Sequence, residues 1–250
     1  MTPSAPFSAT LDALDAVVLR SRERSDRSGF FAALYRGVTR EVAARAAAGQ
    51  FEHAARMERF VAEFAERYLA AHRAWCAGHP TSAAWAVAFA SARRWRPVLL
   101  QHLVVGINAH INLDLGITAV ELGGEGGLEE LADDFRTVNE VLGSLVDRSQ
   151  EAVNRVSPWF GLADRFGARG DEELIRFSLR HAREQAWRFA QRLAELPAVQ
   201  RPAEIDRVDR AVAGIAERVL HPGVRLSVPL FVVRLREPWR VDPVLDALSA

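Results

Sequence analysis

One stretch of the sequence, Arg96 to Glu121, most constrains how this chain can fold. It reads RPVLLQHLVVGINAHINLDLGITAVE, an apolar run in which five polar side chains recur: His102, Asn108, His110, Asn112 and Asp114. Burying such a group without a partner costs roughly 2–7 kcal/mol. A buried helix of this kind therefore needs a bound metal, a ligand or a hydrogen-bond network to satisfy its polar groups.

The polar residues of this stretch occupy two sides of the predicted helix. A helix advances about 100° per residue, so His110 and Asp114 lie about 40° apart on one face, with His102 about 80° from His110 on its flank. Asn108 and Asn112 form a second pair on the opposite side. A surface helix keeps one apolar stripe and one charged face, so this pattern indicates a central helix contacted all round.

The remaining chain also follows helical spacing, and we predict an all-α fold, a multi-helix bundle around the buried helix Pro97–Glu121. Strands and helices do not alternate, and no repeat recurs at a fixed period. We expect a single helical domain over residues 1–250, with 1–28 as a peripheral N-terminal segment and 197–250 as a C-terminal helix and tail. Further helices are predicted at residues 8–22, 29–48, 51–77, 84–94, 128–156, 171–196 and 204–219.

The tail after His221 has a different composition. Its run Leu226–Leu235 is rich in residues that favour strands, and Pro229 interrupts it. The composition predicts either a short extended edge segment or an irregular tail packed across the bundle.

Charge and composition narrow the possible partners. Lysine plus arginine and aspartate plus glutamate both number 32, so the net charge is zero. This argues against a nucleic-acid binder and weakens the case for electrostatic attachment to anionic membranes. The start resembles no secretory signal, and no apolar run reaches the roughly 18 residues of a membrane span, which predicts a cytoplasmic protein. Cys76 is the one cysteine, so no intrachain disulfide can form; we read it as a structural thiol.

The His110–Asp114 face suggests a metal site. Imidazole and carboxylate are common ligands of zinc, iron and manganese, and His102 would complete a set of three. Further donors could come from other parts of the chain: Asp133, Asp134, Asp164, Asp171 and His181. Two alternatives stay open, a metal-free catalytic site and a structural network in which these side chains satisfy neighbouring helices and loops.

A second group of candidates lies on the helix predicted at 171–196. Arg183 and Trp187 are spaced i,i+4 near its apolar side. A buried arginine needs an acidic partner, which Asp114 or Asp134 could supply. Arg183 would then be either half of a structural ion pair or a clamp for a substrate carboxylate. Three residues are predicted to contact substrate: Asn112, Asp134 and Trp187.

The segment G-I-N-A-H-I-N-L-D-L at Gly106–Leu115, preceded by L-Q-H-L, resembles the signature of a bacterial, mainly actinobacterial, family of domains of unknown function, number 5995. Further similarities lie in the segments F-x3-F-A-x-R-Y-L at Phe60–Leu69, D-D-F-x3-N at Asp133–Asn139 and A-R-x2-A-W at Ala182–Trp187. The resemblance implies an all-α fold with these polar residues lining one pocket. It implies no particular activity.

Three functions are compatible with the sequence, each with a small molecule as partner. The first is a metal-dependent hydrolase or oxygenase, with a divalent zinc, iron or manganese ion held by His102, His110 and Asp114. The second is a metal-free biosynthetic cyclase or isomerase, with His110–Asp114 as the base pair and Asn108 or Arg183 polarising a carbonyl. The third is a helical binding module for an apolar ligand.

Overall fold

The computed structural model of the chain describes residues 4–51, 53–123, 128, 151, 153–157 and 171–249, with only the backbone at 171–180 and 225. Its elements are α1 (Ala5–Arg24), α2 (Gly29–Ala47), α3 (Ala54–Cys76), α4 (Ala83–Ala92), α5 (Leu99–Ala109), the π-helical turn η1 (His110–Asp114), α6 (Leu115–Gly123), α9 (Asp171–Glu195), the 3-10 turn η3 (Ala198–Gln200), α10 (Arg201–Leu220), α11 (Val224–Arg236) and α12 (Val241–Ser249). No strand occurs among these described residues, which confirms the all-α prediction.

The central helix is the continuous segment α5–η1–α6, residues 99–123. It begins two residues later than predicted, because Val98 is the N-cap and its N–H donates to the Gln101 side-chain oxygen (3.1 Å). Contrary to the expectation that no apolar run is long enough to span a bilayer, this helix alone among the described residues could cross a membrane by length and composition. Most of its apolar window, 72%, is nevertheless buried inside the protein.

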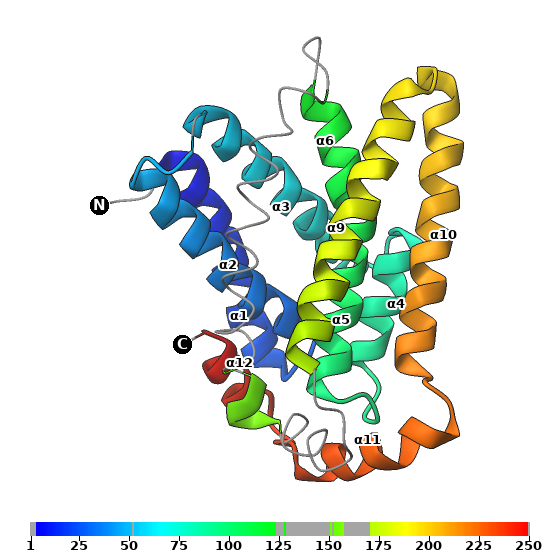
Figure 1. Cartoon of the computed structure of the whole chain (residues 1–250). Coiled ribbons are helices and arrows are strands. Elements are labelled where there is room, and N and C mark those ends of the chain that lie inside the picture. Colours follow the sequence, from blue (N-terminus) through cyan, green and yellow to red (C-terminus); the bar gives the residue numbers. More distant parts are fainter. Residues whose placement is uncertain are drawn as a thin grey trace.

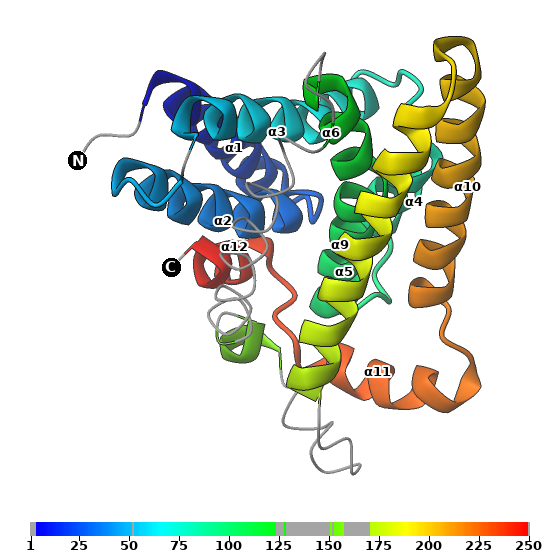
Figure 2. The ribbon, with the colours of Figure 1, turned by 45° about the horizontal axis from the view of Figure 1, so that its top comes forward.

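The other helices surround this central one (Figure 1). Figure 2 shows α1, α2, α3 and α12 gathered on one side of it, and α9 and α10 on the other. Helix α9 packs along η1 and α6, whereas α10 packs on α4 and α5. The N-terminal segment, expected to be peripheral, contributes Leu14 and Val17 to the core, because the apolar residues of α1 recur at helical spacing.

Two glycines let neighbouring helices approach the central helix closely. A Cβ on Gly106 would lie 2.7 Å from the ring of Phe31 on α2. A Cβ on Gly116 would lie 2.5 Å from the Phe189 ring and 3.0 Å from the Ala186 carbonyl oxygen on α9. Contacts this short leave no room for a Cβ, so helix packing explains why both positions are glycine.

Gly116→Ala is therefore expected to lower the free energy of unfolding by about 1–3 kcal/mol, as overpacked cores do. Gly37→Ala is the matched control, since among the described residues no atom outside the adjoining turns of α2 lies within 4 Å of a Cβ at that position. There the same substitution should raise stability by up to about 1 kcal/mol, the usual advantage of alanine over glycine in a helix. Urea unfolding of both variants measures the two effects, and equal shifts would contradict the packing argument.

The C-terminal tail is helical, so the prediction of an extended or irregular segment is wrong for Leu226–Leu235. This run lies within α11, with Pro229 inside the helix. The valines and the phenylalanine made the segment look strand-like. Their spacing is nevertheless helical, since Val224, Val228, Phe231 and Leu235 recur at i, i+4, i+7 and i+11.

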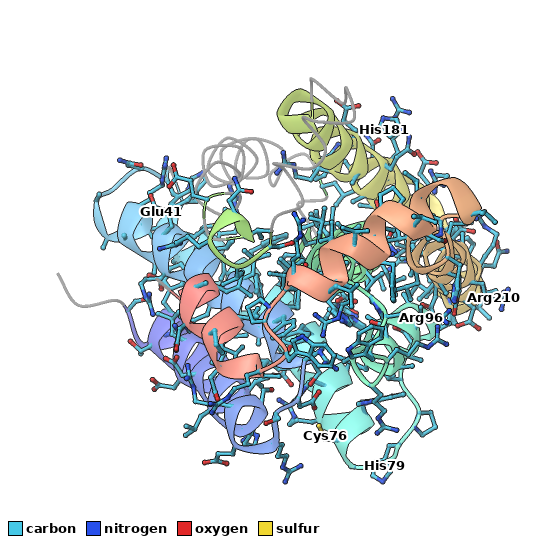
Figure 3. All side chains as sticks on the ribbon, turned by 90° about the horizontal axis from the view of Figure 1, so that it is seen from below. Glu41, Cys76, His79, Arg96, His181 and Arg210 are labelled. Carbon is cyan, nitrogen blue, oxygen red and sulfur yellow. The ribbon has the colours of Figure 1, made fainter. Side chains whose placement is uncertain are left out.

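A buried carboxylate ties this tail to the start of the central helix. Glu237, 4% exposed, accepts the N–H of Leu99 (3.0 Å), the hydroxyl of Ser157 (2.6 Å) and a guanidinium N–H of Arg234 (3.4 Å). A negative charge at a helix N-terminus also interacts favourably with the helix dipole. Figure 3 looks onto this end of the molecule, where α11 crosses the bundle.

Candidate functional site

The π-helical turn of the central helix carries a buried histidine–aspartate pair. Within this turn, the Leu115 N–H donates to the carbonyl of His110, five residues earlier. The Asp114 carboxylate lies 3.1 Å from His110 Nδ1, and the same oxygen, Oδ2, accepts the indole N–H of Trp85 on α4 at 2.9 Å. His110 is 3% exposed and Asp114 is 4% exposed. Single π-helical turns are found frequently at functional sites, so this turn is the candidate functional site of the chain.

Four aromatic rings surround the His110 imidazole. Phe64 on α3 stacks on it with ring centroids 3.6 Å apart, and Tyr35 on α2 meets it edge-on at 4.6 Å. Phe31 and Trp85 complete the enclosure at 5.6 and 6.1 Å. Of the four, Phe64 alone is only partly buried. Phe64 is therefore the ring of this enclosure that lies nearest to solvent.

Burial sets the protonation of the pair. Desolvation lowers the pKa of His110, an effect that the hydrogen bond donated to Asp114 partly offsets, so the imidazole is neutral near pH 7. A neutral imidazole that donates Nδ1–H to the carboxylate keeps a lone pair on Nε2. Nε2 is itself buried and makes no hydrogen bond within the described residues.

The backbone carbonyl of Asp114 is connected to the surface through Thr118. The Thr118 hydroxyl donates to the Asp114 carbonyl (2.9 Å) and lies 3.1 Å from Arg67 Nε, and Arg67 also pairs with Glu121. The positive charge of Arg67 contributes to the lowered pKa of His110.

His102 does not join His110 and Asp114, so the predicted three-ligand metal set is wrong. Eight residues of helix separate the two histidines by about 12 Å along the axis, a distance that angular arithmetic ignores. The His102 ring instead lies 3.3 Å from the Ser91 hydroxyl, which donates to Ala88. Among the described residues, no group of three histidines, cysteines, aspartates or glutamates could hold a metal.

Neither of two cavities lined by described residues brings His102, His110 and Asp114 together. Two water-sized cavities, of about 10 and 20 Å³, are lined by His102 and by neither His110 nor Asp114. Gly106 lines the larger one, together with Phe31. Burial and the nearby Arg27 and Arg234 lower the pKa of His102 to about 3.

The two asparagines join the central helix to α10. Asn108 donates from its amide to the Val212 carbonyl (2.9 Å), and its amide oxygen accepts from Asn112 (3.0 Å). Both ends of the Asn108 amide are therefore occupied. This arrangement is structural. The Asn108 amide is engaged by α10 and Asn112 and so does not polarise a substrate carbonyl, and Asn112 lies away from the imidazole.

The remaining predicted site residues lie on or near α9. Arg183 is buried there and Trp187 is partly buried, but within the described residues Arg183 is not a partner of the Asp114 carboxylate. His181 lies on the outer side of α9, and the Cys76 thiol is exposed (Figure 3). Four acidic predictions fall where no side chain is described: Asp133, Asp134, Asp164 and Asp171.

Sequence reasoning missed the aromatic partners of the pair, Tyr35, Phe64 and Trp85. One signal was available, because a tryptophan in an apolar helix such as α4 buries an indole N–H that requires an acceptor. The sequence could not show that the acceptor lies 29 residues away at Asp114.

Comparison with known proteins identifies the family of this chain. No curated protein and no solved structure matches the chain. A family model does match, over residues 7–222, which covers every residue of the site just described. Because this match spans well over half of the sequence, the chain belongs to DUF5995, a family of unknown function.

Proposed function

We propose that the protein is a metal-free enzyme in which His110 acts as general base on a small, planar and largely apolar substrate. One observation carries the proposal: Asp114 holds Nδ1 of a neutral imidazole, while Nε2 has no partner among the described residues. An unpaired buried nitrogen costs free energy. It is also the atom that a proton-abstracting histidine must present to its substrate.

The surroundings of the pair support base catalysis. After proton uptake at Nε2, the Asp114 carboxylate would stabilise the imidazolium, as the aspartate of a catalytic triad does. Trp85 fixes the carboxylate through its indole N–H, so the imidazole keeps one tautomer and one orientation. The aromatic rings around it favour a flat apolar substrate, which would enter past Phe64.

The same geometry disfavours a metal held jointly by His110 and Asp114. The carboxylate hydrogen-bonds Nδ1, whereas a metal would bind at Nε2, on the other side of the ring. Asp114 would then orient the ligand from outside the coordination sphere. A metal-dependent reaction would need other donors than the two that the structure brings together.

The test uses 5-nitrobenzisoxazole, a flat probe whose ring opens when a base removes the C3 proton: the C–H electron pair forms the C≡N bond of a nitrile, the N–O bond breaks, and its electrons stay on the ring oxygen, which gives the coloured 2-cyano-4-nitrophenolate. Protein treated with EDTA should accelerate this reaction beyond free imidazole at the same concentration. His110→Gln should remove about 10²–10⁴-fold of the acceleration, the usual contribution of a general base. His79→Gln, at an exposed histidine (Figure 3), should leave it unchanged.

Accessibility of the base is measured independently of any substrate. Phe64→Ala should speed the modification of His110 by diethyl pyrocarbonate, followed by mass spectrometry, because it removes the ring stacked on the imidazole. Equal turnover by the wild type and His110→Gln would refute the proposal. Loss of turnover on adding EDTA would indicate a metal-dependent enzyme, and tight ligand binding without turnover would indicate a binding module.

A further inference from the structure

Helix α11 presents an apolar stripe to solvent rather than to the core. Val224, Val228, Phe231 and Leu235 fall within an arc of about 60° on the helix. Their exposed fractions are 85%, 65%, 48% and 49%. An amphipathic helix on a globular protein normally buries this stripe, so its exposure marks an interaction surface.

Aromatic side chains extend this surface beyond the helix. Trp95, in the segment before the central helix, packs against Phe231 at 6.0 Å and against Trp239 at 5.7 Å between ring centroids. Trp239 is 64% exposed. Figure 3 looks onto this face, with α11 crossing it and Arg96 beside it.

Exposed arginines occur in the two segments that form this surface, although Arg234 is buried and Arg240 pairs with Asp242. Segments 93–96 and 224–240, which meet here, contain seven arginines and one acidic residue, Glu237. Glu237 is buried against Arg234, so its charge is not available at the surface. Arg96 and Arg236 are exposed. The zero net charge of the whole chain therefore conceals a locally basic face.

We propose that this face, formed by α11, Trp95 and Trp239, docks on an anionic lipid surface. A helix that combines an apolar stripe, interfacial tryptophan and arginine lies in the plane of a membrane interface, with its apolar side among the acyl chains. The exposed arginines would contact the lipid phosphates, and each arginine near such a surface strengthens binding by about fivefold.

Two other partners fit the face less well. Face-to-face pairing of two copies would oppose arginine to arginine, with no exposed acidic side chain in these segments to compensate. A nucleic acid would neutralise the arginines but leave Val224, Val228 and Leu235 exposed to water, because its backbone offers phosphates rather than apolar surface.

Flotation of the full chain with vesicles tests the proposal. The protein should float with vesicles of equimolar phosphatidylcholine and phosphatidylglycerol, should stay unbound with phosphatidylcholine alone, and should be released by salt. Val228→Ser and Trp239→Ser should each lower partitioning about tenfold, and Arg96→Gln with Arg236→Gln at least about tenfold. Leu19→Ser and Arg20→Gln on α1, an exposed apolar residue and an exposed arginine elsewhere, are the matched controls and should change nothing.

Several outcomes would overturn the proposal: no flotation with the anionic vesicles, an equal loss in Leu19→Ser, self-association in sedimentation that Trp239→Ser abolishes, or binding to a DNA duplex that Val228→Ser leaves intact. Circular dichroism melting of each variant shows that it is folded. If one serine variant fails to fold, the arginine pair carries the test, since exposed arginines contribute little to the core.

Discussion

Asp114→Ala is expected to cost about 2–6 kcal/mol of stability, because one carboxylate oxygen satisfies two buried donors. The substitution leaves His110 Nδ1–H and the indole N–H of Trp85 without an acceptor. Each unsatisfied buried donor costs about 1–3 kcal/mol. For a domain of this size, the melting temperature should fall by roughly 2–4 °C per kcal/mol. Trp85 is 1% exposed, so water cannot easily replace the lost acceptor.

Asparagine at the same position separates the charge from the hydrogen bonds. Its amide oxygen can occupy the place of Oδ2 and accept both donors, so Asp114→Asn should lose less than half as much stability as Asp114→Ala. Asp246→Ala is the surface control: its carboxylate pairs with Arg22 in an exposed position, where ion pairs are worth about 0–1 kcal/mol. Thermal melts of the three variants compare these effects directly. A melt of Asp114→Ala that matches the wild type would show that the two hydrogen bonds accepted by Asp114 do not stabilise the fold.

The central helix was predictable from the sequence because burial leaves a long apolar run, and polar residues inside such a run require partners wherever they lie. The pairing of His110 with Asp114 also followed, since residues spaced i,i+4 meet on a helix. The direction of the His110 pKa shift is a consequence of burial that any fold with this helix at its centre would share. These are properties of a single helix, and the sequence of that helix is enough to predict them.

The site predictions that failed concerned which residues lie close together in the folded protein. The angular position of His102 suggested a shared site, but rise along the helix separates it from His110 by about 12 Å. Trp85, Phe64 and Tyr35 come from three other helices, and no local pattern specifies which helix they face. The prediction for the tail failed for another reason. Residue type favoured a strand at Leu226–Leu235, whereas the i,i+4 spacing favoured a helix, which is what the structure contains.

Acid is expected to destabilise the protein through its buried histidines. Desolvation lowers the pKa of His72, His102 and His110 in the folded state, whereas in the unfolded chain each should titrate near 6.5. Well above pH 6.5 the two states bind equal numbers of these protons. As the pH falls below that value, the unfolded chain binds more protons than the folded protein. The free energy of unfolding therefore decreases as the pH is lowered.

His102 gives the clearest magnitude and the variant that tests the argument. With its folded pKa at about 3, this residue alone should remove about 2 kcal/mol of stability between about pH 7 and pH 5. Glu237 acts in the opposite direction, because burial raises its pKa and its protonation in acid favours the folded state. Urea unfolding at several pH values should therefore show a shallower decline for His102→Gln than for the wild type, and an unchanged decline for His79→Gln at the exposed position. Parallel curves for His102→Gln and the wild type would show that His102 does not cause the loss of stability in acid. A shallower curve would show that protonation of this buried imidazole, at the start of the central helix, destabilises the folded protein.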